Sequence, residues 1–414
     1  MKVRNVLVAQ LAATLLGLIA LRFKWPTWRD FVIAIDHGDL CFADFVHHYY
    51  PTVAESLRHG APAGGFFYPA GFAAMIAPLG LLSLKGAITV WSVVLGASFG
   101  VVSFVLVRHA APERGWLAAA GSFIAMTSIP MLHDVKWGQV SLPILASAGL
   151  AFVLYERRPY AAAALLGVAA GIKGYPLVFV GWFLLRGDLK FVLRAAAACG
   201  VTLVVLPVLV MGPSHALFFQ RVSTGAVLGA ADGVLRDFNS QYAPAVLARY
   251  EGGWDATAAD VRAMSELGSF AALAAIGVLV FVAARSTAKT IAAHREMIGL
   301  VLLASSVPFW LRTSWSHYFV HLPVAQTLLT HLLLGDGRRI PRHWLALVVL
   351  VGPSLFLAGV LGLFVTEGWW FYANAGSLFF ANLLVIFGCA IVVVEAHARE
   401  GAPLLAPLRR IRLG

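Results

Sequence analysis

Charged side chains are scarce in this chain. They make up 12% of its 414 residues, whereas hydrophobic residues make up 60% and the mean hydropathy is +0.81. A soluble domain of this length could not bury so much apolar surface, which excludes the soluble globular class. We predict an all-α polytopic membrane protein, because backbone groups in lipid must be satisfied within each segment and the apolar runs are too long for barrel strands.

Several signatures of other functions are also absent. The chain has no Gly-rich phosphate-binding loop, no dinucleotide fingerprint and no HExxH motif, so a nucleotide-dependent mechanism is not expected. Two of the three cysteines fall in apolar runs and one in a loop, which predicts no structural disulfide. The net charge of +11 comes from basic residues scattered through short connections. This pattern fits orientation in membrane lipid and predicts no nucleic-acid partner.

Uncharged apolar runs recur along the whole chain, each near the ~20 residues that cross about 30 Å of hydrocarbon as a helix. They cover residues 5–21, 86–107, 115–131, 139–155, 195–212, 267–284, 297–311, 318–334, 345–366 and 375–394. We interpret the first run as a retained anchor, because no small-x-small cleavage site follows it. Residues 1–414 are predicted to form one integral membrane domain, a bundle of about 12 transmembrane helices.

Two topologies compete, and they differ in whether residues 67–83 cross the membrane. If this segment crosses, several basic connections fall outside the cell, against the excess of Lys and Arg expected in cytoplasmic loops. If it lies at the interface or re-enters, and residues 159–186 form two short helices broken at GIKGYP, the basic connections fall inside. We prefer the second topology, in which both termini of this multi-pass cell (inner) membrane protein are cytoplasmic.

In the preferred topology the two longest loops are both extracytoplasmic. They cover residues 24–84, with interfacial helices, and residues 213–265. Three polar stretches fall on the same face: HDVKWGQ (133–139), GIKGYP (171–176) and LRTSWSH (311–317). Polar groups gathered on one face indicate an extracytoplasmic active site at the lipid boundary. A membrane transporter more often places its polar groups near the middle of the bilayer.

The richest polar stretch is CFADFVHHYYP, residues 41–51. On a helix, Asp44, His47 and His48 would share a face at spacings of three and four. A half-buried carboxylate flanked by histidines is suited to accept a proton from a hydroxyl group. The alternatives are a loop cap or a solvated ion pair with Arg58. Two adjacent histidines beside an aspartate match no closed metal site, so no metal is predicted, although a divalent cation is compatible with the sequence.

Candidate ligands for a phosphate come from two other stretches. Lys173 occupies the break in a long apolar stretch, where a lysine is costly unless it meets an anion or snorkels to the interface. A polyprenyl phosphate head group is an anion found at that depth. Arg312 and His317 stand at a helix entrance and are either phosphate and sugar ligands or ordinary interface residues.

Other polar side chains suit the binding of sugar hydroxyl groups. Gln139 ends the stretch HDVKWGQ, and Asn239 and Ser240 belong to FNSQYAP. A role in capping a loop explains Gln139 as well as sugar binding does. Turn formation explains Asn239 and Ser240 equally well.

Taken in order, these stretches resemble glycosyltransferase family 87, the polyprenyl-phosphate-mannose-dependent mannosyltransferase-like members of the GT-C superfamily. The resemblance rests on an Asp-aromatic-Tyr-Tyr segment after the first helix, followed by FFYPAGFAAMIAPLGLLSL, WGQVSLPILASAGLAF, GVAAGIKGYPLVFVGWFLLRG, FNSQ and SWSHYF. It spans roughly residues 1–335 and depends on the order and spacing of the strings. The family often has YPP where this chain has Tyr68, Pro69 and Ala70.

The resemblance implies a GT-C-like bundle with its site on the extracytoplasmic side. It implies that Asp44 is the catalytic base, with Asp36 and Asp39 as neighbouring candidates. Donor phosphate binding is assigned to Lys173, Arg312 and His317. Substrate binding is assigned to His47, His48, Tyr49, Gln139, Asn239, Ser240 and Trp315.

We therefore expect a glycosyltransferase that moves a hexose or pentose, with mannose favoured, from a polyprenyl-phosphate donor to a glycolipid or glycan acceptor. A lipid phosphate already leaves well, so the enzyme needs a base for the acceptor hydroxyl and cations for the departing phosphate, and no cofactor. One base without a covalent nucleophile implies inversion at the anomeric carbon. The alternatives are a lipid-linked sugar flippase, a small-solute transporter, and an assembly subunit without catalysis.

Overall fold

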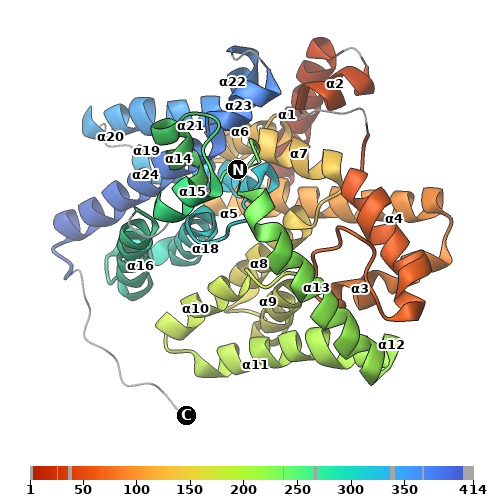
Figure 1. Cartoon of the computed structure of the whole chain (residues 1–414). Coiled ribbons are helices and arrows are strands. Elements are labelled where there is room, and N and C mark those ends of the chain that lie inside the picture. Colours follow the sequence, from red (N-terminus) through yellow and green to blue (C-terminus); the bar gives the residue numbers. More distant parts are fainter. Residues whose placement is uncertain are drawn as a thin grey trace.

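The computed structural model describes residues 3–25, 27–35, 40–235, 237–264, 268–335, 341–365 and 368–403. Within these ranges the chain forms helices joined by turns, and its one isolated bridge, between Ser128 and Gly359, belongs to no strand. The all-α class predicted from composition is confirmed (Figure 1).

Most helices are short, because prolines and glycines interrupt the apolar runs. In chain order they are α1 Val3–Lys24, α2 Trp28–Ile35, α3 Ala70–Ile76, α4 Leu84–Gly100, α5 Val107–Ala110, α6 Gly115–Met126, α7 Ile129–Trp137, α8 Ser141–Leu154, α9 Pro159–Ile172, α10 Leu177–Leu185, α11 Leu189–Gly200, α12 Leu206–Met211, α13 Pro213–Val234, α14 Ala243–Gly252, α15 Ala258–Met264, α16 Phe270–Arg285, α17 Lys289–Ala293, α18 Arg295–Ser306, α19 Leu322–Leu334, α20 Pro341–Ala346, α21 Gly352–Ala358, α22 Val360–Val365, α23 Trp369–Asn374 and α24 Ser377–Glu400. Two π-helical turns, Phe45–Tyr49 and Thr52–Ser56, lie between α2 and α3.

Four helical segments of the described chain are long and apolar enough to cross a membrane: Val3–Lys24, Leu84–Ala110, Leu189–Met211 and Ser377–Glu400. The pair α7 and α8, bent by 120°, would form a fifth. Shorter apolar helices of 10–17 residues accompany them at Ala70–Leu81, Gly115–Met126, Pro159–Ile172, Phe270–Arg285 and Arg342–Ala358. These helices agree with a polytopic membrane protein, and the number of about 12 spans stays a prediction.

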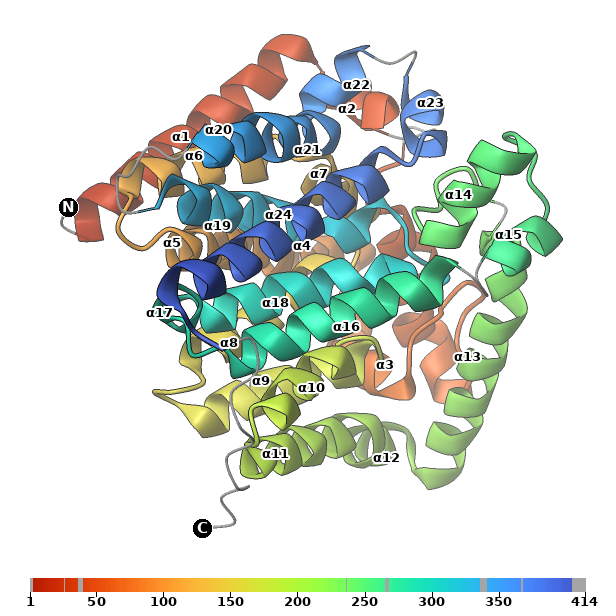
Figure 2. The same ribbon diagram turned by 90° about the vertical axis from the view of Figure 1, so that its left-hand side faces the viewer.

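The helices pack into one bundle with a large apolar core, and two smaller buried clusters accompany it. Figure 2 shows α16, α18 and α24 side by side, with α19 next to α24 and α1 along one edge against α6. Leu142, Leu302 and Leu328, from α8, α18 and α19, belong to the same buried cluster. Outside this core, Leu16, Val93 and Leu209 are each more than half exposed, as suits helices in contact with lipid.

The two ends of the bundle carry different segments. At one end Tyr155 donates a hydrogen bond of 2.8 Å to Asp188, which brings the α8–α9 and α10–α11 connections together. At the other end lie α2, α13, α14 and α23, where Arg249 donates a 3.0 Å bond to the carbonyl oxygen of Asn374 (Figure 2).

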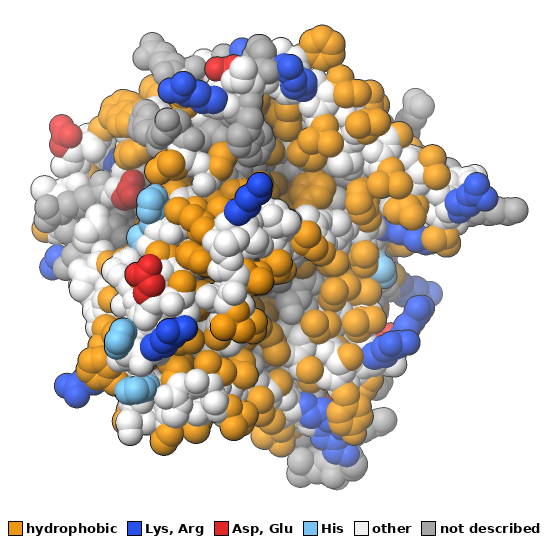
Figure 3. Space-filling model, turned by 90° about the vertical axis from the view of Figure 1, so that its right-hand side faces the viewer, with side chains coloured by type: hydrophobic (Ala, Val, Ile, Leu, Met, Phe, Trp, Pro, Cys, Tyr) orange, Lys and Arg blue, Asp and Glu red, His pale blue; other side chains and the backbone are white. Residues whose placement is uncertain are grey.

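On the face in Figure 3, hydrophobic side chains form a broad area and most visible acidic and histidine side chains lie to its left. Which end faces the cytoplasm stays a prediction.

The helix over residues 70–81 and the hairpin of α9 and α10 are both compatible with the preferred topology. Residues 70–81 form a helix of about 18 Å at 1.5 Å per residue, too short to cross the hydrocarbon layer. The GIKGYP break separates α9 from α10, and the bond between Tyr155 and Asp188 ties the far ends of this helical hairpin. Lys173 therefore lies at the hairpin's tip, within the bundle.

The expectation of a loop at HDVKWGQ was wrong. Most of it belongs to α7, which begins at Ile129 with Pro130 in its first turn. The helix ends at Trp137 and is capped by Gly138, whose φ is +68. Asp134, which the sequence analysis did not single out within this stretch, is fully buried in α7. Its Oδ1 accepts a 3.2 Å hydrogen bond from the backbone nitrogen of Leu142 and so stabilises the bend into α8.

Candidate active site

A cavity of about 260 Å³ lies between the tip of the α9–α10 hairpin and the segment that follows α2. Its lining comes from segments far apart in the sequence: Asp44, Gly65, Phe67, Tyr68, Pro69, Gln139, Lys173, Gly174, Tyr175, Val227, Ala230, Leu311, Thr313, Trp315 and Tyr318. Four of the predicted site residues, Asp44, Gln139, Lys173 and Trp315, meet here. The cavity joins one carboxylate and one ammonium group within a largely aromatic and aliphatic wall.

The backbone around Asp44 is anchored on both sides. Phe42 has φ +58 and is the one non-glycine residue with a positive φ in the described chain; such a conformation costs about 1–3 kcal/mol and persists where surrounding contacts enforce it. Its backbone nitrogen donates to the carbonyl oxygen of Lys136. On the other side, the ring of Phe45 stacks on Trp91 at 5.5 Å. Asp44 is thus fixed between contacts to α7 and to α4.

The amide of Gln139 connects Asp44 to two buried phenols. Its Nε2 donates a hydrogen bond to Oδ2 of Asp44, and its Oε1 accepts bonds of 2.9 Å from Tyr68 and 3.4 Å from Tyr49. The two phenol oxygens lie 2.6 Å apart. Because a carboxylate only accepts, the amide nitrogen must face Asp44 and its oxygen must face the phenols. This network fixes the orientation of the carboxylate.

Lys173 lies between two tyrosine rings. Its Nζ is 4.9 Å from the ring centre of Tyr68 and 4.4 Å from that of Tyr318. Burial lowers the pKa of Lys173, but the oxygens of Tyr318 and Tyr68 outweigh this effect and the pKa lies above its ordinary value. Burial raises the pKa of Tyr68 to about 12, although the charge of Lys173 opposes it. At neutral pH this wall therefore presents a charged ammonium group and a protonated phenol.

The histidines after Asp44 lie outside the cavity lining. Phe45–Tyr49 is π-helical, so its hydrogen bonds run from i to i+5 and spacings of three and four no longer keep side chains on one face. His47 is exposed, and Nδ1 of His48 lies 2.7 Å from the carbonyl oxygen of Gly64. A substrate-binding role for both histidines stays a prediction.

Two segments on the far side of the cavity hold each other in place. Oγ of Ser316 donates a 2.8 Å hydrogen bond to Oδ1 of Asn239, and the backbone nitrogen of Gln241 donates a 2.7 Å bond to the carbonyl oxygen of Ser314. These contacts position Trp315, which lines the cavity. Asn239 supports the wall and does not itself belong to the lining.

Three further predicted residues also lie outside the lining. Ser240 is buried behind the wall and Arg312 is exposed. His317 is 2% exposed, with its ring 5.7 Å from that of His133. Burial and the charge of Lys173 lower the pKa of His317 well below its ordinary value, so its ring is neutral. Of the three predicted phosphate ligands, only Lys173 lines the cavity; roles for the other two stay predictions.

Two tyrosines that contact Lys173 were missed from the sequence. Tyr68 was named only in the comparison with the family's YPP, and Tyr318 was not singled out within SWSHYF. The available signal was a tyrosine inside each of two motifs on which the family resemblance rests. The alternative bases Asp36 and Asp39 lie outside the described residues.

The structure offers no grouped metal ligands in the part of the chain that it describes. Nowhere there do three His, Cys, Asp or Glu side chains come close enough to hold a metal ion. The absence of a cofactor stays a prediction.

Comparison with known proteins adds family information to this geometry. A model of glycosyltransferase family 87 matches residues 66–306, more than half of the chain, a range that contains Tyr68, Gln139 and Lys173 but not Asp44. One curated relative is the polyprenol-phosphate-mannose-dependent alpha-(1-2)-phosphatidylinositol mannoside mannosyltransferase of Mycolicibacterium smegmatis, 33% identical over 152 residues. The match covers 33% of this chain and 34% of that relative, so the chain spans about a third of the relative's length. No solved structure matches.

Proposed function

The chain belongs to glycosyltransferase family 87, and from this premise we propose that it transfers a hexose or pentose from a polyprenyl-phosphate donor to a glycolipid or glycan acceptor. The observation that carries the proposal is the cavity in which Asp44, Gln139 and Lys173 meet from three separate segments. Mannose is the favoured sugar, because the curated relative is named for its dependence on polyprenol-phosphate mannose.

Lys173 would bind the donor phosphate. Among the described residues that line the cavity it is the one basic side chain, and its raised pKa keeps it charged. A charged donor in a site with little water stabilises an anion more strongly than it would in bulk water. The hydroxyl group of Tyr318, whose ring centre lies 4.4 Å from Nζ, adds a neutral donor for the phosphate oxygens.

Asp44 would act as the general base. It would take the proton of the acceptor hydroxyl as that oxygen bonds to the anomeric carbon, while the bond from this carbon to the donor phosphate oxygen breaks. The electron pair leaves with the polyprenyl phosphate, whose charge Lys173 balances. A single displacement of this kind inverts the anomeric configuration. Gln139 would hold the carboxylate in position throughout.

The site would face the extracytoplasmic side, where the polar segments of the preferred topology meet. Polyprenyl phosphates are held in the membrane by their hydrocarbon tails, so the enzyme must receive its donor from the lipid phase. Short helices such as α3 and the α9–α10 hairpin, which do not span the membrane alone, would admit the head group beside the lipid boundary.

The test is transfer of label from a panel of radiolabelled polyprenyl-phosphate sugars by the purified protein in liposomes containing a membrane lipid extract. We expect label to leave one donor and appear in lipid or glycan. Asp44→Asn should abolish the transfer, whereas Asp255→Asn, which changes an exposed aspartate away from the cavity, should leave it intact.

Two outcomes would contradict the proposal. The first is transfer that is indifferent to Asp44→Asn. The second is intact donor with every sugar of the panel combined with movement of the labelled lipid between leaflets, which would assign the protein to the flippases.

A further inference from the structure

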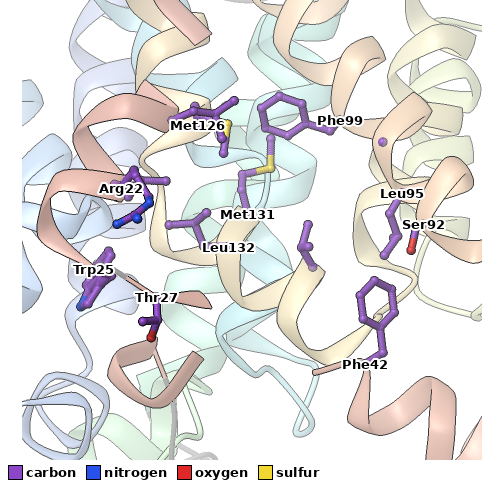
Figure 4. Close-up of a pocket in the computed structure, with 14 residues that line it drawn as sticks. Arg22, Trp25, Thr27, Phe42, Ser92, Leu95, Phe99, Met126, Met131 and Leu132 are labelled. Atoms are coloured by element: carbon purple, nitrogen blue, oxygen red, sulfur yellow. The ribbon is translucent and has the colours of Figure 1, made fainter. Parts of the chain in front are cut away.

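Two apolar grooves border the C-terminal half of α1. The first groove has a volume of about 710 Å³ and lies between α1, α4, α6 and α7 (Figure 4). The second groove has a volume of about 610 Å³ and lies between α1, α6, α19, α21 and α22. Leu21 is the one described residue that lines both. Both volumes are typical of ligand-binding cavities, so the polar atoms of each groove determine what it can hold.

The hydroxyl groups of the first groove are already hydrogen-bonded. Oγ of Ser92 donates a 2.8 Å bond to the carbonyl oxygen of Ile88, and Oγ1 of Thr27 donates a 2.6 Å bond to Asp30. Figure 4 shows both side chains among aromatic and aliphatic neighbours. An acyl chain in the first groove therefore leaves neither hydroxyl group unpaired.

The second groove has two buried polar atoms that are unpaired. Gln326, near the start of α19, and Ser128, just before α7, both belong to its lining, and each is 1% exposed. Within the described part of the chain, neither Oε1 of Gln326 nor Oγ of Ser128 has a hydrogen-bond partner. A buried polar atom without a partner is costly and uncommon. An acyl chain in this groove would leave both atoms unpaired.

The neighbours of Gln326 determine which end of its amide is unpaired. Nε2 donates a 2.9 Å hydrogen bond to Oγ of Ser354, and Ser354 donates a 2.9 Å bond to the carbonyl oxygen of Ala381. Because a carbonyl oxygen only accepts, Ser354 uses its proton there and must accept from the amide nitrogen. The unpaired atom of Gln326 is therefore its amide oxygen, which requires a donor.

Ser128 occupies the N-cap position of α7 without capping the helix. A serine at this position commonly accepts a hydrogen bond from the first turn, but the side chain of Ser128 makes no such bond. Its backbone pairs with Gly359, and the backbone nitrogen of Val360 donates a 3.1 Å bond to the carbonyl oxygen of Thr127. These backbone contacts fix the position of Ser128 and leave its hydroxyl group able to donate and to accept.

One hydroxyl group of a ligand can satisfy both atoms. It donates one hydrogen bond to Oε1 of Gln326 and accepts another from Oγ of Ser128. A phosphate monoester fits less well, because at neutral pH it is an anion that offers acceptors where Gln326 needs a donor. The rest of the described lining is apolar apart from Lys24, exposed in the last turn of α1, and Thr127, whose hydroxyl group bonds the carbonyl oxygen of Phe123 at 3.0 Å.

We propose that the second groove binds a neutral lipid alcohol, a molecule with a long hydrocarbon chain and one terminal hydroxyl group. Phe23 and Leu361 line the groove and are largely exposed, so its ligand can enter from the bilayer. The groove shares no lining residue with the cavity of Asp44 and Lys173. Binding there does not depend on the proposed transfer reaction.

Photocrosslinking of the full chain in phosphatidylcholine nanodiscs tests the proposal. The three probes are polyprenol, its methyl ether and polyprenyl phosphate, each with a diazirine close to the polar end, and labelled peptides are mapped by mass spectrometry. We expect polyprenol to label Phe123, Leu355 and Phe356 about fivefold more than the ether, or better, because the ether leaves buried Gln326 without a donor.

The first groove provides an internal control. Polyprenol and its ether should label Phe99 and Met131 equally, because the hydroxyl groups of that groove are already paired.

Two substitutions remove the unpaired polar atoms one at a time. Gln326→Met should lower polyprenol labelling to that of the ether, while Ser354 keeps its bond to Ala381. Ser128→Ala should lower labelling by both probes, because both can accept from the serine hydroxyl group. Ser147→Ala is the control and should leave labelling unchanged, since its hydroxyl group bonds a carbonyl oxygen outside the groove.

A matched pair of alanine substitutions tests occupancy of the groove. Ala20 and Ala12 are both exposed on α1, but only Ala20 lines the groove. Leucine changes helix propensity little at either position. Ala20→Leu should lower polyprenol labelling about fivefold, because its added side chain displaces methylene groups of the ligand. Ala12→Leu should leave labelling unchanged.

Three outcomes would overturn the proposal. Equal labelling of the second groove by polyprenol and its ether would assign the groove to bulk lipid, with water at the polar atoms. Stronger labelling by polyprenyl phosphate would assign it to the chain of the sugar donor. A preference for polyprenol that survives Gln326→Met would show that the amide oxygen does not accept from the ligand.

Discussion

Two aspartates near the candidate site have opposite surroundings. Asp44 follows α2, is half-buried, lines the catalytic cavity and accepts a hydrogen bond from Gln139. Asp134 lies within α7, is fully buried and accepts a hydrogen bond from the first turn of α8. The first carboxylate faces a space that a ligand can enter, and the second holds the bend that carries Gln139. Their contrast separates a group suited to chemistry from one suited to stability.

The largest expected effect is on turnover, and it follows from changing Asp44, the aspartate that lines the cavity. Asp44→Asn should lower turnover about 10²–10⁴-fold, the range for loss of a general base. Its free energy of unfolding should change by no more than about 1 kcal/mol, because the asparagine fits the same half-buried position. Turnover is measured from initial rates, and stability from thermal unfolding, in the same detergent preparation. A variant that keeps turnover within tenfold of the native protein would remove Asp44 from the mechanism.

Lys173→Met should raise the donor KM by about 10–150-fold. A hydrogen bond to a charged group contributes about 1.5–3 kcal/mol, and the methionine keeps the apolar contacts with Tyr68 and Tyr318. Steady-state kinetics with varied donor measure the effect. Lys85→Met, at an exposed position outside the cavity, is the control and should leave KM unchanged. A normal donor KM in Lys173→Met would place the phosphate elsewhere.

On the stability side, Asp134→Ala should lower the free energy of unfolding by about 1–3 kcal/mol. It leaves the buried backbone nitrogen of Leu142 without its acceptor. Asp134→Asn keeps an acceptor oxygen, so its loss of stability should be smaller. Denaturant unfolding in detergent compares the two variants. If Asp134→Ala is as stable as the native protein, Asp134 does not hold the α7–α8 bend.

A smaller effect should follow from loss of one phenol hydroxyl. Tyr68→Phe removes the 2.9 Å bond to Gln139, and a hydrogen bond of about 0.5–1.5 kcal/mol predicts a fall in kcat/KM of about two- to tenfold. Tyr50→Phe is the matched control, since its hydroxyl bonds the carbonyl oxygen of Leu82 outside the cavity. Equal kinetics for the two variants would show that the phenol does not position the carboxylate.

The smallest expected effect concerns pH. The pKa of buried His317 is lowered, so the unfolded chain binds its proton first and stability falls as pH drops below 6.5. The slope has an upper limit of about 1.4 kcal/mol per pH unit for one group. Unfolding measured from pH 7 to pH 5 should show a shallower slope in His317→Gln; an equal slope would contradict a buried neutral ring.

The sequence predicted those features that depend on local composition. Apolar runs predicted the helices, and the break at GIKGYP predicted where Lys173 would enter the bundle. Asp44, Gln139 and Lys173 were each recognised because a polar residue stands out within an apolar chain, and Trp315 was recognised through the family resemblance. The structure brings the four into one cavity.

The remaining features depend on contacts between distant segments. Tyr68 and Tyr318 have no distinctive local pattern in so aromatic a chain, and only the fold places both beside Lys173. Local helical spacing does not indicate the π-helical turn Phe45–Tyr49, and His47 within it lies outside the cavity lining. Asp134 was missed because its helix is too short and polar to resemble a span.

Chemical rescue of Asp44→Ala is the most direct test of the account. Azide needs no base, so it should restore donor consumption in this variant and give a glycosyl azide of inverted anomeric configuration. Asp134→Ala should show no such dependence on azide. A variant at Asp44 that azide does not rescue, or a product of retained configuration, would contradict the assignment of Asp44 as the base of a single displacement.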